Sequence, residues 1–109
     1  LLMLSIFSCS KNNVKFTIEN ARTKPIDSII ISNGFDRSGI VHLGQGQEGK
    51  FTLNFSKNVN SDGSYCIEIY QNNSEKKQNF GYFSNGSPLE KEFRIKILND
   101  TIDIASKLN

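Results

Sequence analysis

Residues 92–97 read Glu-Phe-Arg-Ile-Lys-Ile, a strict alternation of charged and apolar side chains. Successive side chains of a β-strand point to opposite faces, so Phe93, Ile95 and Ile97 would share one face. The charged residues between them would then face water, as in a sheet with one buried and one solvated side. This stretch therefore predicts an all-β fold built from half-buried strands.

The same period of two recurs along the chain, whereas helical periodicity is nearly absent. We expect strands at 14–18, 26–31, 40–43, 51–55, 65–70, 80–83, 93–97 and 101–104. Turn sequences such as Asn33-Gly34 and Asn60-Ser61-Asp62-Gly63 separate them, and 72–77 is a further polar turn. The pattern predicts a single antiparallel β-sandwich of seven to eight strands, similar to immunoglobulin-like or transthyretin-like domains.

The stretch 26–31 departs from simple alternation. Ile29, Ile30 and Ile31 follow one another, which puts apolar groups on both faces of the strand. Strands that are apolar on both faces are typical of positions covered on both sides. We therefore expect a central strand with both faces covered.

Composition bounds the size and the charge of the molecule. The chain has 109 residues, 13 of them basic and 11 acidic, with a net charge of +2 and the signs interspersed. This length suits one domain with one core. Nucleic-acid binding is not expected, because there is no basic block to attract phosphates.

The N-terminal run 1–7 is apolar and is followed by Ser8, Cys9 and the polar stretch 10–13. It is too short to span a bilayer, which takes about 20 residues, but it fits the apolar region of a secretory signal peptide. Ile6-Phe7-Ser8-Cys9 resembles the end of a bacterial lipoprotein signal peptide, in particular that of small lipoproteins of the Bacteroidota group.

That resemblance implies a partial signal peptide at 1–8, a lipidated tether at 9–13 and a β-sandwich domain at 14–109. Cys9 would carry the lipid and attach the protein to a membrane of the cell envelope, most simply the outer membrane, facing the periplasm or the surface. The alternative is an ordinary N-terminal strand at 1–8 with Cys9 as a core thiol. If Cys9 is lipidated, Cys66 is left unpaired; otherwise the two cysteines could form a disulfide.

Three motifs could carry chemistry, and each has a simpler explanation. Gly44 to Gly49 matches G-x-G-x-x-G, but an alternating strand follows it instead of a helix, which predicts a flexible loop between strands. His42, the only histidine, has no nucleophile or metal-ligand spacing around it. A calcium loop at Asp62 would need a closing Glu where the chain has Gln71, so a plain turn is expected. We expect no catalytic residue, metal or cofactor.

Phe80-Gly81-Tyr82-Phe83 is the least ordinary stretch. Phe80 and Tyr82 would share one face and Phe83 the other, so a half-buried strand would expose at least one large ring. Exposed aromatic rings are good anchors for a protein or glycan partner. With Phe35, which has no obvious strand partner, these residues form the predicted partner-binding surface. The alternative is that both faces pack inside the sandwich, with Gly81 permitting close approach.

Two tripeptides, Asp27-Ser28-Ile29 and Asp100-Thr101-Ile102, resemble the O-glycosylation acceptor motif of Bacteroidota. The resemblance implies that Ser28 and Thr101 are modified. Taken together, the sequence favours a lipid-anchored, non-enzymatic interaction module. A carbohydrate-binding lipoprotein and a periplasmic inhibitor or immunity protein are the alternatives.

Overall fold

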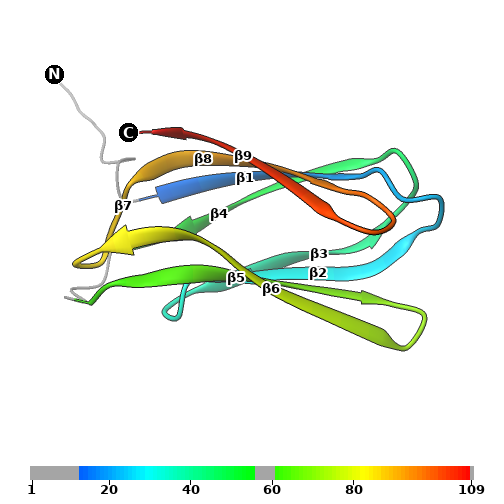
Figure 1. The fold of residues 1–109 in the computed structure, drawn as a ribbon, viewed down its shortest axis with the longest axis horizontal. Helices are drawn as coiled ribbons and strands as arrows, with labels where there is room; N and C mark the ends of the chain where they lie inside the picture. The colour runs from blue at the N-terminus through cyan, green and yellow to red at the C-terminus, as the bar shows by residue number, and fades with distance from the viewer. Residues whose placement is uncertain (1–12, 56–60, 109) are drawn as a thin grey trace, which may run out of the picture.

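The computed structural model describes residues 13–55 and 61–108, and these residues form strands and turns without a helix. None of them therefore belongs to a helix that could cross a membrane. Nine strands follow one another along the chain (Figure 1): β1 (Asn13–Asn20), β2 (Ile26–Ser32), β3 (Arg37–Leu43), β4 (Glu48–Asn54), β5 (Gly63–Gln71), β6 (Ser74–Ser84), β7 (Ser87–Pro88), β8 (Glu90–Ile97) and β9 (Ile102–Leu108).

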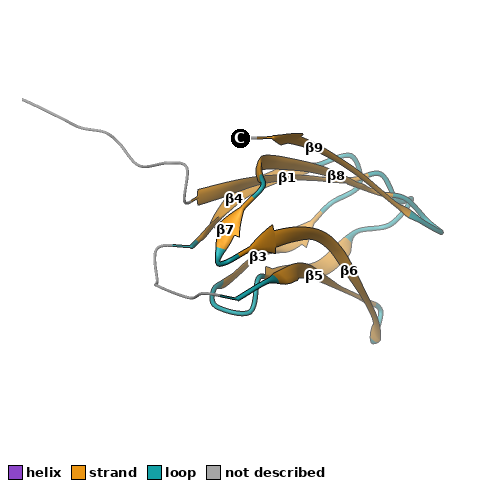
Figure 2. Ribbon diagram, turned by 60° about the vertical axis from the view of Figure 1, so that its left-hand side comes forward, coloured by secondary structure: helices purple, strands orange, loops and turns teal. Residues whose placement is uncertain are grey.

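The strands form two packed sheets, which confirms the predicted all-β sandwich. One sheet has the order β4-β1-β8-β9 and the other β3-β2-β5-β6-β7, and Figure 2 shows them as two layers. Strands β1 and β8 are parallel, whereas the other paired strands are antiparallel. In an immunoglobulin domain the first two strands are neighbours in one sheet. Here β1 and β2 lie in different sheets, so the strand order differs from that of an immunoglobulin domain.

Several strands are longer than predicted, and the largest differences lie around β6. The polar stretch 72–77 is not one loop: Asn72 and Asn73, both with positive φ, make a two-residue turn and β6 begins at Ser74. Such turns match the twist of the strands they join. The short strand β7, in which Pro88 pairs with Phe83 of β6, was not predicted. Two residues are too few to show alternation.

The apolar faces of both sheets meet in an aromatic core. The Phe16 ring lies 5.5 Å from both the Phe93 and Phe51 rings and 5.6 Å from the Tyr65 ring of the opposite sheet. Phe93, Ile95 and Ile97 are all at most 2% exposed, as their alternation predicts. Aromatic pairs of this kind contribute about 0.5–1.5 kcal/mol each beyond the burial of their area.

The expectation that the strand at 26–31 is covered on both sides is wrong. Strand β2 is internal, between β3 and β5, and Ile29 and Ile31 are fully buried against the other sheet. Ile30 points the opposite way and is only half-buried. Within residues 13–55 and 61–108 no third layer lies over that face. The Ile30 side chain, in an internal strand, is thus left partly exposed.

Candidate functional site

The outer faces of the two sheets differ in chemistry. That of the four-stranded sheet is charged along all four strands and carries Lys15, Glu19, Glu48, Lys50, Glu92, Arg94, Lys96, Asp103 and Lys107. Arg94 lies across its middle, with guanidinium nitrogens 3.7 Å from a Glu48 oxygen and 3.6 Å from a Glu92 oxygen. Charged rows of mixed sign are well solvated, so this face suits contact with water.

The outer face of the five-stranded sheet combines apolar, aromatic and polar groups. We call it the Tyr70 face and define it by five residues of β2, β3 and β5: Ile30, Val41, Cys66, Glu68 and Tyr70. Ile30 lies beside Glu68 and Gly39 in the register of the strands. Val41 on the edge strand β3 is 68% exposed. This face therefore presents apolar surface that the chain itself does not cover.

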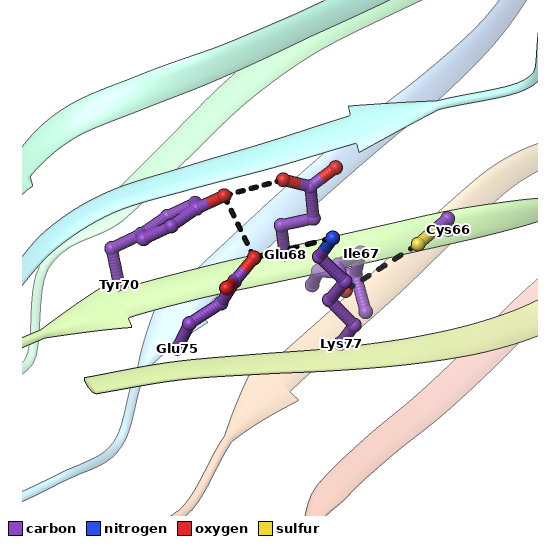
Figure 3. Close-up of polar contacts among 6 residues, drawn as sticks. All are labelled: Cys66, Ile67, Glu68, Tyr70, Glu75 and Lys77. Carbon is purple, nitrogen blue, oxygen red and sulfur yellow. Dashed lines mark hydrogen bonds and ion pairs between the residues drawn. The ribbon is translucent and has the colours of Figure 1, made fainter.

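Hydrogen bonds to two carboxylates hold Tyr70 in place (Figure 3). Its hydroxyl oxygen lies 2.6 Å from Oε1 of Glu68 and 3.0 Å from Oε2 of Glu75, the residue opposite it on β6. Lys77 Nζ lies 3.4 Å from the same Glu75 oxygen. The hydrogen bond to Glu68, followed by that to Glu75, raises the pKa of the Tyr70 phenol. The ring is thus held as a neutral donor with a fixed position.

Cys66 lies on the same face. It is half-buried, its Sγ is 3.9 Å from the carbonyl oxygen of Ile67, and Asn79 is opposite it on β6. In the described part of the chain, no three His, Cys, Asp or Glu side chains gather as a metal site would require. What the Tyr70 face offers chemically is contact surface.

The predicted aromatic surface is wrong for Phe80 and Phe83, because both rings belong to the core. Phe80 is 9% and Phe83 is 2% exposed, whereas Tyr82 is 47% exposed. The register of β6 against β5 shifts here, and Gly81 has a φ of +66°. Such a bulge adds one residue and reverses the alternation. Both phenylalanines therefore face inward and Tyr82 faces out, so the alternative, in which both faces pack inside, holds for the two phenylalanines but not for Tyr82.

Phe35 packs over one end of the core. Phe35 lies in the β2–β3 loop and is half-buried. The centroid of its ring is 5.7 Å from that of the Phe83 ring. The loop is fixed by Asn33, which is 2% exposed and whose side-chain oxygen accepts the N–H groups of Phe35 at 2.9 Å and Asp36 at 2.8 Å. Asparagine commonly closes turns in this way. Phe35 therefore serves mainly as a cover for the core.

Tyr82 is exposed but anchored at its tip. The hydrogen bond from its hydroxyl to Asp62 raises the pKa of Tyr82. Asp62 also accepts the N–H of Asn85 at 2.9 Å, and this bond, followed by that from Tyr82, lowers the pKa of Asp62. The Asp62 carboxylate thus joins the β6–β7 turn to the start of β5. Asp62 directly precedes β5, and Asn60 of the predicted turn lies outside the described residues.

The other residues singled out by the sequence analysis lie in different parts of the chain. Cys9, the partial signal peptide and most of the tether lie outside the described residues. Ser28 is half-buried within β2, flanked by β3 and β5, whereas Thr101 is exposed in the β8–β9 turn. His42 is exposed in β3 with a φ of +57°. Of the loop expected from Gly44 to Gly49, residues 44–47 form a turn between β3 and β4, whereas Glu48 and Gly49 already belong to β4.

The buried residue Asn20 was not singled out from the sequence. Its side chain lies at the end of β1 and binds backbone groups of the β1–β2 connection and of β3. Its sequence neighbourhood does not distinguish it from the exposed asparagines of the chain, because the partner in the other sheet, Leu43, is 23 residues away.

No protein-family model matches this sequence, and no curated protein matches it.

Proposed function

We propose that this protein is a lipid-anchored, non-enzymatic interaction module of the bacterial cell envelope, and that it binds a protein partner through the Tyr70 face. The observation that carries the proposal is Ile30, an apolar side chain on an internal strand that no other described element covers. On the outer face of β2, Ile30 lies between Ser28 and Ser32 and is only half-buried, so it offers one apolar contact in the middle of the sheet. A partner protein would supply the missing layer.

The position of Tyr70 supports the same surface. Tyrosine is enriched among the residues that dominate interface energetics, because it adds a large apolar ring with a polar tip. Hydrogen bonds to Glu68 and Glu75 already restrict the ring, so little side-chain entropy is lost on binding. Glu75 and Lys77 at the rim add charges that can select the partner.

The anchor rests on the sequence around Cys9. A single acyl chain binds membranes only marginally, so stable attachment needs further chains, as lipidated cysteines of bacterial lipoproteins carry. Lipidation would leave Cys66 as the one free thiol, and Cys66 is unpaired among the residues that the structure describes.

Site-specific photo-crosslinking in cells tests the interaction surface. A photoreactive amino acid at Val41, on the Tyr70 face, should give one defined protein adduct. The matched control is the same amino acid at Thr52, which is exposed on the outer face of the four-stranded sheet. The adduct from position 41 should be lost on Tyr70→Ala substitution in the same chain. Equal adducts from positions 41 and 52, or an adduct indifferent to Tyr70→Ala, would contradict the proposal.

Intact-mass measurement of membrane-extracted protein tests the anchor separately. We expect an acylated mass that disappears in Cys9→Ser, together with one titratable thiol after unfolding. An unmodified mass would remove the anchor without bearing on the Tyr70 face. Binding to glycans on an array that is lost on Tyr70→Ala substitution would instead favour the carbohydrate-binding alternative.

A further inference from the structure

The start of β1 shares one end of the sandwich with the ends of β6 and β9. Strand β1 runs parallel to β8, with Lys15 beside Glu92, and the start of β8 pairs with the end of β9 through Glu90 and Leu108. Figure 1 shows the start of β1, the end of β9 and β7 on the same side of the molecule. We call this the anchor end and define it by Asn13, Tyr82, Leu89 and Leu108.

Three exposed apolar side chains are neighbours in the strand register at the anchor end: Tyr82 and Leu89 flank the paired residues Phe83 and Pro88, and Leu89 precedes Glu90, which pairs with Leu108. The large hydrophobic residues exposed in the described part of the chain are Leu108 at 70%, Val41 at 68%, Tyr82 at 47% and Leu89 at 45%. All but Val41 belong to the anchor end. Single exposed hydrophobic residues are normal on a protein surface, whereas a group of them marks an interaction site.

The length of the tether limits what can cover this end. Cys9 precedes Asn13 by four residues, and an extended chain spans about 3.3–3.6 Å per residue, which gives roughly 14 Å at most. A lipid on Cys9 therefore holds the start of β1 within that distance of the bilayer surface. The three exposed side chains of the anchor end are then held near the same surface at a high effective concentration.

We infer that the anchor end rests on the lipid bilayer, with Leu108 and Leu89 entering its interface and Tyr82 lying at the level of the headgroups. This inference depends on the lipidation of Cys9 proposed above. Leucine side chains gain by leaving water. Tyrosine favours the interface because its ring is apolar and its tip polar, and here Asp62 binds that tip. Lys91 and Lys107, both exposed beside these residues in sequence, can extend their ammonium groups towards water and headgroups.

The absence of tryptophan from the chain makes a direct test possible. Leu108→Trp and Leu89→Trp each place a single reporter at the anchor end, and Val41→Trp is the matched control at an exposed site of the Tyr70 face. Each acylated variant is reconstituted into phosphatidylcholine vesicles with ordinary or brominated acyl chains. We expect the emission of Leu108→Trp and Leu89→Trp to shift to the blue and to be quenched at least twofold by bromine. The emission of Val41→Trp should stay that of water-exposed tryptophan.

Three other outcomes are separable. Unquenched, water-like emission from both anchor-end reporters in protein with a confirmed acyl mass would overturn this inference and leave the proposed anchor intact. Blue-shifted emission that bromine does not quench would also overturn it, because protein would then cover the patch. A protein that carries no acyl group at Cys9 would refute the anchor itself.

Discussion

The side-chain amide of Asn20 donates a hydrogen bond to the carbonyl oxygen of Leu43 at 2.9 Å and thereby joins the two sheets. Asn20 ends β1 in one sheet and Leu43 ends β3 in the other. The same amide donates to the Lys24 carbonyl at 3.0 Å, and the Asn20 side-chain oxygen accepts the Arg22 N–H at 2.9 Å. One buried side chain thus fixes the β1–β2 connection against the end of β3.

Replacing Asn20 with alanine should therefore destabilise the fold strongly. Buried carbonyl and N–H groups would lose their partners, at a cost of about 2–4 kcal/mol in the free energy of unfolding. Urea unfolding followed by circular dichroism measures this. Asn79→Ala, on the exposed side of β6, is the control and should change stability by less than about 0.5 kcal/mol. A similar small change for Asn20→Ala would show that water replaces the side chain.

Gly81 and Gly46 separate steric crowding from backbone strain. Both have positive φ, +66° and +77°, but a Cβ at Gly81 would lie 2.8 Å from Tyr65 Cδ1, whereas one at Gly46 would meet nothing within 4 Å. Gly46→Ala should cost about 1 kcal/mol for its backbone conformation. Gly81→Ala should cost about 2–4 kcal/mol, because overpacking of the core adds to the strain. Equal losses in thermal unfolding would argue against the bulge at Gly81.

Phe83 and Tyr82 should respond in opposite ways to truncation, although they are neighbours. Phe83→Ala removes a ring that is 2% exposed and should lower the free energy of unfolding by about 3–5 kcal/mol. Tyr82→Ala removes a ring that is 47% exposed and should cost about 1 kcal/mol or less. Calorimetry of the two variants decides this. A Phe83→Ala variant as stable as the unmodified chain would show that the Phe83 ring is not buried.

Tyr65 should make the fold sensitive to alkali. Burial, and then the charge of Glu90, raises the pKa of the Tyr65 phenol above its ordinary value of 10.0. The folded state therefore holds a proton that the unfolded state releases above pH 10, so this part of the stability is present below pH 10 and is lost as pH rises further. Among residues 13–55 and 61–108, no group forms a hydrogen bond with the Tyr65 hydroxyl.

Tyr65→Phe should accordingly unfold with nearly unchanged free energy at neutral pH, within about 1 kcal/mol. Between pH 10 and 11 its stability should fall less steeply than that of the unmodified chain. Urea titrations at several pH values measure both effects. A large loss at neutral pH would mean that the hydroxyl has a bound partner.

Thr101 should be the better acceptor if the two Asp-Ser/Thr-apolar tripeptides are used. Thr101 is exposed in a turn, whereas Ser28 is half-buried within an internal strand. Modifying enzymes need an accessible hydroxyl. Mass spectrometry of protein produced in a Bacteroidota host should show glycan mass that Thr101→Val removes and Ser28→Ala leaves. The opposite pattern would require modification before folding.

The alternation at 92–97 and its repeats predicted the fold well, because period two directly encodes which face of a strand is buried. It failed where a feature depends on a partner strand. Gly81 shifts the register by one residue, which sends Phe83 inward, and a bulge is not visible in local alternation. Whether an outer face is covered, and hence whether Ile30 is partly exposed, depends on how many layers the chain forms. Asn20 depends on partners such as Leu43, 23 residues away.

The position of β1 has a mechanical consequence. This strand leads from the proposed anchor and is hydrogen-bonded along its length to β4 on one side and β8 on the other. A pull on Asn13 along the strand, as between a membrane and a bound partner, would load both ladders in shear, so that their bonds must break together and not one after another. The first strand would then act as a force-bearing clamp.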